Sequence, residues 1–105
     1  ALHFVRFVQS MARAGVPIWA VSVQNEPAAA QSWESCLYTA KEECSFVRDH
    51  LGPTMASAGL EEVKILVWDH NRDGMLERAA HVYSDPEVAK YVWGVAYHWY
   101  GDARF

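Results

Sequence analysis

The sequence has no excess of basic residues, no long apolar run and few cysteines. Its 9 Lys and Arg are outnumbered by 13 Asp and Glu, for a formal net charge of −4. A basic surface for nucleic acid is therefore not expected. No apolar run approaches the roughly 18 residues of a membrane-spanning helix, so no transmembrane segment is predicted. Two cysteines, Cys36 and Cys44, are too few for a disulfide framework. We expect both to be reduced, buried small residues, with one bridge between them as the alternative.

The sequence also lacks the spacings that mark common metal and cofactor sites. It contains no His-x-x-x-His or Cys-x-x-Cys pair. No Gly-rich phosphate loop follows any of its apolar segments. Asp69, His70 and His98 have side chains that can ligate a metal, but their spacing is not that of a metal motif. We therefore expect no metal and no cofactor.

The composition is that of a globular protein, with 51% hydrophobic and 21% charged residues. The 105 residues of the chain amount to about 0.7 of a domain at roughly 150 residues per domain, which is enough for one small core. The chain begins inside an expected helix and stops a few residues after an expected strand. We therefore expect residues 1–105 to form a single, incomplete part of a larger domain.

Helical and extended patterns alternate along the chain. Thr39 and Glu42 have the spacing of a capping box, and Asp85-Pro86 is a helix start signal. Gly52-Pro53 is expected to kink or break the helix that starts at Thr39. The apolar runs between the helices are rich in β-branched residues, as in parallel strands covered on both faces. The predicted order is helix 2–14, strand 18–23, a helix from residue 39, strand 63–68, helix 74–83 and strand 92–97. This order indicates an α/β fold with a parallel sheet.

Polar side chains follow each of the three predicted strands, in the segments Asn25-Glu26, Asp69-His70 and His98-Trp99-Tyr100. In parallel α/β folds the ligand lies at the carboxyl ends of the strands, so we expect these segments to meet at one site. The predicted strands start at residues 18, 63 and 92, whereas a (β/α)8 barrel uses about 31 residues per unit. The chain thus corresponds to about three units of a barrel. A doubly wound open sheet fits the alternation equally well.

Four motifs carry a resemblance to a known family. They are Asn25-Glu26-Pro27 after an apolar strand, Leu51-Gly52-Pro53-Thr54 in the next helix, Trp68-Asp69-His70-Asn71, and His98-Trp99-Tyr100. With these motifs the chain resembles the clan-A retaining glycoside hydrolases and, among them, family 30, the glucosylceramidase-like enzymes. The resemblance covers essentially the whole chain. It implies a partial (β/α)8 TIM barrel, about strands four to six with their helices, with residues 1–105 as the central part of the catalytic domain.

The resemblance also implies functional roles. In this family the glutamate at the position of Glu26 is the general acid/base, and the asparagine at the position of Asn25 binds the sugar 2-hydroxyl. The nucleophile is a second glutamate on strand seven, beyond Phe105. We therefore expect the remainder of the barrel to complete the site, and the 105-residue chain alone to be inactive. The implied substrate is a β-linked carbohydrate or glycolipid, cleaved by double displacement without a cofactor. An extracytoplasmic location is favoured, since enzymes of this resemblance are often secreted or lysosomal.

The tryptophans divide into a candidate for binding and candidates for the core. Trp33 lies in the loop after Glu26 and is the best candidate for stacking on a sugar, because pyranose C–H groups pack well on aromatic rings. Trp19, Trp68 and Trp93 lie within or at the ends of predicted strands. We expect these three side chains to be part of the core.

The polar residues at the ends of the second and third strands have two interpretations each. Asp69 and His70 can bind sugar hydroxyls, or Asp69 can orient His70 or pair with Arg72 in a local network. By the family resemblance, His98 and Tyr100 lie close to the catalytic carboxylates and tune or orient them. The alternative for these two is a half-buried pair whose polar groups are satisfied locally.

Two other interpretations of the whole chain stay open at the level of the sequence. The chain could belong to a non-catalytic, carbohydrate-binding descendant of such a barrel that has lost the nucleophile. A glutamate at the end of strand seven would distinguish the enzyme from this descendant. The chain could also be a stand-alone small α/β protein with an incidental Asn-Glu-Pro, which cooperative unfolding of the 105-residue monomer would reveal.

Overall fold

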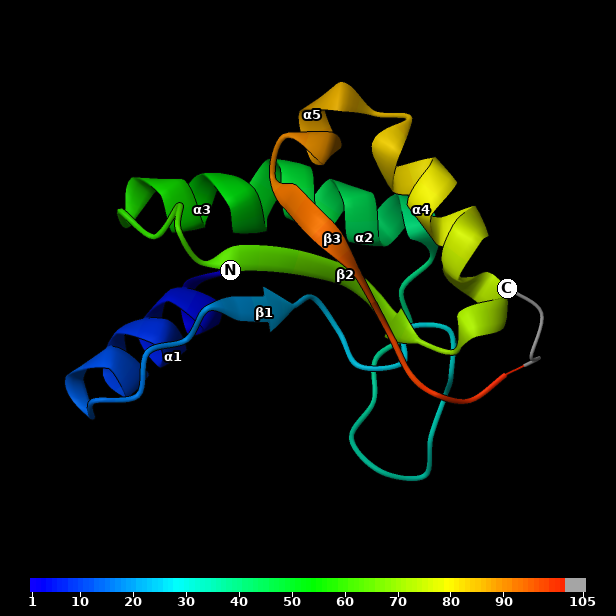
Figure 1. Ribbon diagram of the computed structural model, residues 1–105, viewed down its shortest axis with the longest axis horizontal. Coiled ribbons are helices and arrows are strands. Elements are labelled where there is room, and N and C mark those ends of the chain that lie inside the picture. The colour runs from blue at the N-terminus through cyan, green and yellow to red at the C-terminus, as the bar shows by residue number, and fades with distance from the viewer. Residues whose placement is uncertain (102–105) are drawn as a thin grey trace.

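Three parallel strands form the sheet of the protein. The computed structural model describes residues 1–101. The strand order is β1-β2-β3, with β1 at Ala20–Ser22, β2 at Lys64–His70 and β3 at Val92–Tyr97. Both pairings are parallel, so the carboxyl ends of the three strands meet at one edge of the sheet (Figure 1). The predicted parallel α/β arrangement is confirmed.

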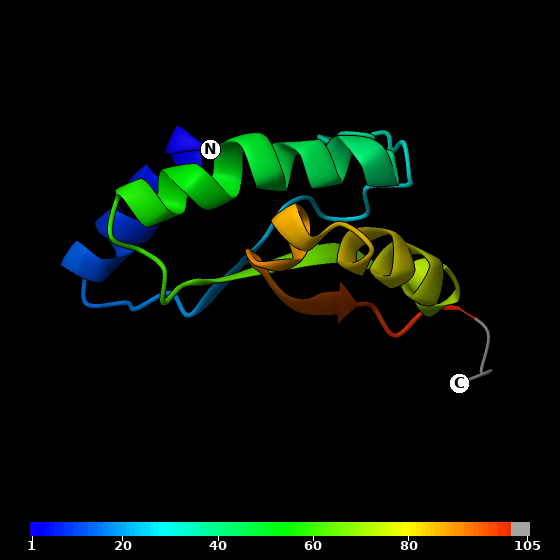
Figure 2. The same cartoon turned by 90° about the horizontal axis from the view of Figure 1, so that it is seen from above.

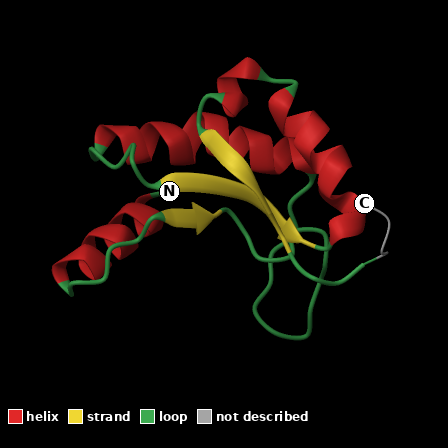
Figure 3. Ribbon diagram, in the orientation of Figure 1, coloured by secondary structure: helices red, strands yellow, loops and turns green. Residues whose placement is uncertain are grey.

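Helices alternate with the strands along the chain (Figure 3). They are α1 (Leu2–Arg13), α2 (Ala40–Phe46), α3 (Gly52–Ser57), α4 (Met75–Tyr83) and the short α5 (Pro86–Ala89), with a π-helical segment η1 (Val47–Leu51) and a 3-10 turn η2 (Arg72–Gly74). Figure 2 shows the continuous segment from α2 to α3 lying along one side of the sheet. Within residues 1–101 no helix is long and apolar enough to cross a membrane.

The hydrophobic core lies between the helices and one face of the sheet. Side chains from that face and from the helices form a single buried cluster, which includes Val5, Val21, Val47, Leu51, Ile65, Val67, Val82 and Val92. Along β1, and along β2 as far as Val67, buried residues alternate with half-buried ones. Within residues 1–101 the strands are therefore covered more completely on one face, whereas the sequence predicted cover on both.

The predicted helix-capping residues make the expected hydrogen bonds. The Thr39 hydroxyl accepts a hydrogen bond from the Glu42 N–H at 3.2 Å, and the Glu42 carboxylate accepts one from the Thr39 N–H at 2.9 Å. These reciprocal bonds form the predicted capping box at the start of α2. Asp85 caps α5 by accepting a hydrogen bond from the Glu87 N–H at 2.9 Å, and Pro86 occupies the first helical position.

The predicted break at Gly52-Pro53 takes the form of a widened turn. The chain stays helical, but η1 replaces one α-helical turn, and the Gly52 N–H donates to the Val47 carbonyl five residues earlier. A π turn accommodates Pro53, which has no N–H and whose ring would clash with the carbonyl four residues earlier in a regular helix. Gly52 itself packs against Tyr91, since a Cβ added there would lie 2.4 Å from the aromatic ring.

Two expectations about buried side chains are wrong. Trp68 is buried as predicted, but Trp19 and Trp93 are 64% and 60% exposed and contact each other edge to face at 5.7 Å. Cys44 is buried in α2, whereas Cys36 is exposed in the loop before it, and both are free thiols. Apolar character identified these segments correctly, but it does not tell which side of a strand or loop other elements cover.

Candidate active site

A row of three half-buried side chains joins the carboxyl ends of the three strands. Glu26 follows β1, Asp69 lies near the end of β2, and His98 directly follows β3. The His98 Nδ1 atom is 3.2 Å from Glu26 Oε1, and its Nε2 atom is 3.2 Å from Asp69 Oδ1. The three side chains are 18%, 22% and 25% exposed for Glu26, His98 and Asp69, respectively. Residues from three separate strand ends thus meet at one site, as the sequence predicted.

The backbone beneath this row is tied together and locally strained. The Glu26 N–H donates to the Asp69 carbonyl at 2.9 Å, and the His98 N–H donates to the His70 carbonyl at 2.7 Å. Glu26, Trp68 and Asp69 have φ angles of 50°, 73° and 46°. Left-handed backbone costs a non-glycine residue on the order of 1–3 kcal/mol and is concentrated at functional sites. Such strain persists only where surrounding contacts hold it.

Both carboxylates of the row have a partner on their second oxygen. The Ser22 hydroxyl donates to Asp69 Oδ2 at 2.5 Å, and the Gln31 amide donates to Glu26 Oε2 at 2.9 Å. Each carboxylate therefore has a defined orientation rather than a freely rotating one. Gln31 reaches Glu26 from the loop that joins β1 to α2, which lies at the carboxyl edge of the sheet (Figure 1).

Each ring nitrogen of His98 faces a carboxyl oxygen, so the proton positions on the ring depend on the charges of Glu26 and Asp69. When Asp69 is ionised, it accepts a hydrogen bond from His98 as well as from Ser22, and His98 then carries a proton on Nε2. The Nδ1 atom then faces Glu26. It can accept a hydrogen bond from a protonated Glu26, or donate one to an ionised Glu26 when His98 is an imidazolium. The row can thus hold one proton in two arrangements.

The Asp69 carboxylate contacts Ser22 of β1 and His98 after β3, so it joins groups from both neighbouring strands. His70 Nδ1 accepts a hydrogen bond from the Asn71 N–H at 2.8 Å, and its ring stacks on Trp68 with centroids 4.9 Å apart.

The remaining predicted site residues surround the row. The Tyr100 ring lies 6.2 Å from the His98 ring and the His70 ring lies 6.4 Å from it, measured between centroids. Asn25 is exposed beside Glu26, and Trp33 is exposed in the following loop. Their roles in binding remain predictions. Within residues 1–101, no three His, Cys, Asp or Glu side chains are grouped so that they could hold a metal ion.

Comparison with known families matches residues 1–105 to the glycosyl hydrolase family 30 TIM-barrel domain. The chain belongs to glycosyl hydrolase family 30. The match confirms the resemblance that the motifs indicated and identifies the three-stranded sheet as part of a TIM barrel. Members of family 30 are glycoside hydrolases.

Individual family 30 relatives agree in sequence and in structure. The lysosomal acid glucosylceramidase of Mus musculus is 38% identical over 106 residues, which cover 97% of this chain and 20% of the relative. The crystal structure of SrfJ from Salmonella typhimurium superimposes with a TM-score of 0.86 at 38% identity, over 92% of this chain and 22% of that chain. An endo-β1,6-glucanase superimposes with a TM-score of 0.85 at 35% identity, over 96% and 23%. The chain spans about a fifth of the length of these relatives.

Sequence reasoning missed two residues of this candidate site. Ser22 is the polar residue between Val21 and Val23 in an otherwise apolar strand, and that break in the pattern was a usable signal. Gln31 lies in an irregular loop, where neither periodicity nor a motif marks the side chain that turns back to Glu26.

Proposed function

We propose that this chain carries the acid/base half of a retaining β-glycosidase active site, with Glu26 as the general acid and base. The placement of Glu26 carries this conclusion. Its carboxyl group lies at the carboxyl edge of the sheet, half-buried, with one oxygen against Gln31 and the other against His98. An acid/base group must be oriented and partly removed from bulk water, and these contacts supply both conditions.

Glu26 has a task in each of the two displacements. First, a nucleophilic carboxylate attacks the anomeric carbon while Glu26 gives its proton to the leaving oxygen, so the glycosidic C–O bond breaks as a glycosyl ester forms. Then ionised Glu26 takes a proton from water as the water oxygen attacks the anomeric carbon and the ester carboxylate departs. We assign the nucleophile to a glutamate of strand seven, beyond Phe105, at about 5–5.5 Å from Glu26.

His98 supports Glu26 in both of its protonation states. A neutral His98 accepts a hydrogen bond from the protonated carboxyl group, and an imidazolium donates one to the carboxylate. Asp69 keeps the ring in the orientation that serves this contact. Because both Asp69 oxygens have protein partners, we propose that Asp69 acts mainly by holding His98.

The substrate contacts that we propose are Asn25, Trp33, His70 and Tyr100. Asn25 can donate and accept hydrogen bonds at once, which suits the sugar 2-hydroxyl, and the exposed Trp33 ring can stack on a sugar face. The substrate class we propose is a β-linked glucoside in a glycolipid or glucan, since the relatives include a glucosylceramidase and an endo-β1,6-glucanase. The mouse relative is named as lysosomal, which supports an extracytoplasmic location.

The stereochemistry of the product tests the proposed function. When the full-length gene product acts on a β-glucoside, the first sugar released should be the β-anomer. Proton NMR spectra recorded before mutarotation would identify this anomer. The 105-residue chain alone should release none, because it lacks the proposed nucleophile. Release of the α-anomer first would contradict double displacement. Sugar binding without hydrolysis would indicate a carbohydrate-binding protein instead.

Replacing His98 with phenylalanine should lower kcat/KM of the full-length protein by about 100-fold, the lower end of what acid/base catalysis supplies. The phenyl ring keeps the packing near Tyr100 but removes both hydrogen bonds. Initial rates on a glucoside with a poor leaving group measure the effect. His81→Phe is the matched control, since His81 is an exposed histidine on α4. Equal rates for the His98→Phe variant and the control would contradict the role of His98.

A further inference from the structure

Trp68 and Asp69 form an irregular segment inside β2. Both residues have left-handed backbone, and the pairing of β2 with β3 shifts register between Trp68 and His70. A bulky residue such as tryptophan rarely adopts this conformation without outside support. Irregularities of this kind re-aim side chains near active sites, and here the re-aimed side chain is Asp69.

A buried carboxylate on α2 holds this segment. The Trp68 N–H donates to Glu43 Oε1 at 3.1 Å, and Glu43 is fully buried. Arg78 of α4 donates from Nη1 to the other Glu43 oxygen at 2.9 Å, and its Nη2 donates to the Tyr38 carbonyl at 3.2 Å. Glu43 and Arg78 therefore tie the irregular end of β2 to α2 and α4.

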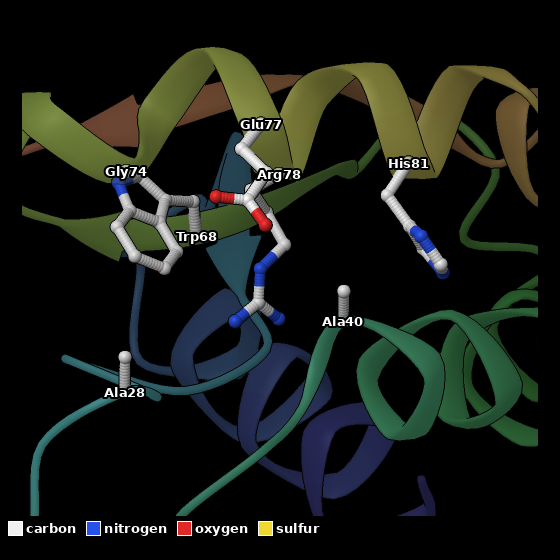
Figure 4. Close-up of a pocket in the computed structure, with 7 residues that line it drawn as sticks. All are labelled: Ala28, Ala40, Trp68, Gly74, Glu77, Arg78 and His81. Carbon is white, nitrogen blue, oxygen red and sulfur yellow. The ribbon is translucent and has the colours of Figure 1, made fainter.

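The indole of Trp68 is also held by its neighbours. Its Nε1–H donates to the Asn71 carbonyl at 2.7 Å, and the Arg78 guanidinium carbon lies 5.0 Å from the ring centroid. Figure 4 shows Arg78 extending from α4 between Trp68 and Ala40, in a pocket of about 410 Å³ that also has Gly74 in its wall. The ring has little room to move, since a Cβ added at Gly74 would lie 2.4 Å from it.

Stability alone does not explain the buried ion pair between Glu43 and Arg78. Buried pairs often contribute no more than apolar residues of the same volume, because both charges lose their hydration. Burial indeed raises the pKa of the Glu43 carboxyl group, while the hydrogen bonds from Trp68 and Arg78 oppose that shift. A carboxylate does supply what a hydrocarbon cannot, which is an acceptor for the Trp68 N–H.

We propose that Glu43 is a positioning residue of the active site, whose carboxylate fixes the Trp68–Asp69 segment and so sets the place of Asp69, His98 and Glu26. The connection is short. Asp69 follows Trp68 directly, contacts His98 through its side chain, and accepts the Glu26 N–H through its carbonyl. The effect on catalysis rests on the proposed glycosidase function, whereas the effect on the backbone does not.

Two double variants of the full-length protein isolate the acceptor. Glu43→Met/Arg78→Met removes the pair without leaving a lone charge, and Glu43→Gln/Arg78→Met does the same but keeps an amide oxygen for the Trp68 N–H. On a glucoside with a poor leaving group, kcat of the Met/Met variant should be at least about tenfold below that of the Gln/Met variant, because small misplacements of catalytic groups are costly. KM should differ little between them. Arg48→Met/Asp49→Met removes a pair at the surface, together with the Arg48–Asp85 contact, and should leave kcat unchanged.

Hydrogen exchange provides a readout that does not depend on activity. The Trp68 amide should be protected in the wild-type protein and in the Gln/Met variant, and should exchange faster in the Met/Met variant. Equal exchange and equal kcat in the two folded double variants would overturn the positioning role. If the Met/Met variant does not fold, Glu43→Asp withdraws the carboxylate while keeping its charge, and should show the same faster exchange and lower kcat. Absence of activity in the wild-type protein would contradict the proposed glycosidase function but not the role of Glu43. Hydrogen exchange of the Trp68 amide would still test whether Glu43 holds this segment.

Discussion

Replacing Glu26 with glutamine in the full-length protein should lower hydrolysis of a glucoside with a poor leaving group by about 100- to 10,000-fold. The amide has nearly the size of the carboxyl group but has no proton to give to the leaving oxygen. An activated aryl glucoside needs little protonation, so formation of its glycosyl ester should continue and only the water step should slow. A burst of released aryl alcohol, followed by slow turnover, measures this difference.

Two further observations make the test of Glu26 specific. Azide attacks the glycosyl ester without a general base, so it should restore turnover of the activated substrate in the Glu26→Gln variant. Glu34→Gln places the same substitution on an exposed residue of the same loop and should have wild-type rates on both substrates. The acid/base assignment would fail if the Glu26→Gln variant lost the same factor on good and poor leaving groups, or lost nothing.

Replacing Gly74 with alanine should impair both stability and activity. A Cβ at this position would lie 2.4 Å from the Trp68 ring, and the ring is held on its other sides by Asn71 and Arg78. Overpacking of this kind costs about 1–3 kcal/mol of unfolding free energy. Because Trp68 precedes Asp69, the displacement should also disturb the row of Glu26, His98 and Asp69. We expect kcat/KM of the folded variant to fall by at least about tenfold.

Gly52→Ala is the matched control for Gly74→Ala. Its Cβ would also approach an aromatic ring to 2.4 Å, but this ring belongs to Tyr91, before the start of β3 and so at the opposite edge of the sheet from the site. Alanine normally stabilises a helix interior relative to glycine, yet here we expect a loss of about 1–3 kcal/mol from overpacking. The apparent melting temperatures of both variants should fall, and only Gly74→Ala should lower kcat/KM at a temperature where both are folded. Equal kcat/KM values for the two variants would show that Trp68 does not constrain the site.

Glu26, His98 and Asp69 form one connected row because both carboxyl groups contact the His98 ring. Glu26 and Asp69 lie on opposite sides of the His98 ring, and each has a further donor, Gln31 and Ser22 respectively. Removing one member changes the orientation of the next, so losses from single substitutions are not expected to add. Double variants that combine changes at His98 and Asp69 should therefore lose little more than the His98 variant alone.

The sequence by itself determined the features that depend on near neighbours along the chain. Thr39 and Glu42 are three residues apart, so their capping box forms wherever a helix starts there. Apolar runs between helices indicated three parallel strands, and the polar segments that follow them indicated one site at a common edge. The motifs around Glu26, Asp69 and His98 also indicated the family, and the comparison with known families confirmed it.

Only the tertiary structure decided which side chains meet and which are covered. Glu26 and His98 are 72 residues apart, and their contact depends on the strand order and register of the sheet. The exposure of Trp19 and Trp93, the π turn before Pro53 and the buried pair of Glu43 and Arg78 likewise depend on packing between distant segments. The sequence pattern shows which residues are apolar or polar. The energy of a contact depends also on its partner, and the fold determines which partner that is. The candidate residues at the strand ends could therefore be named from the sequence, whereas Ser22, Gln31 and the pattern of hydrogen bonds could not.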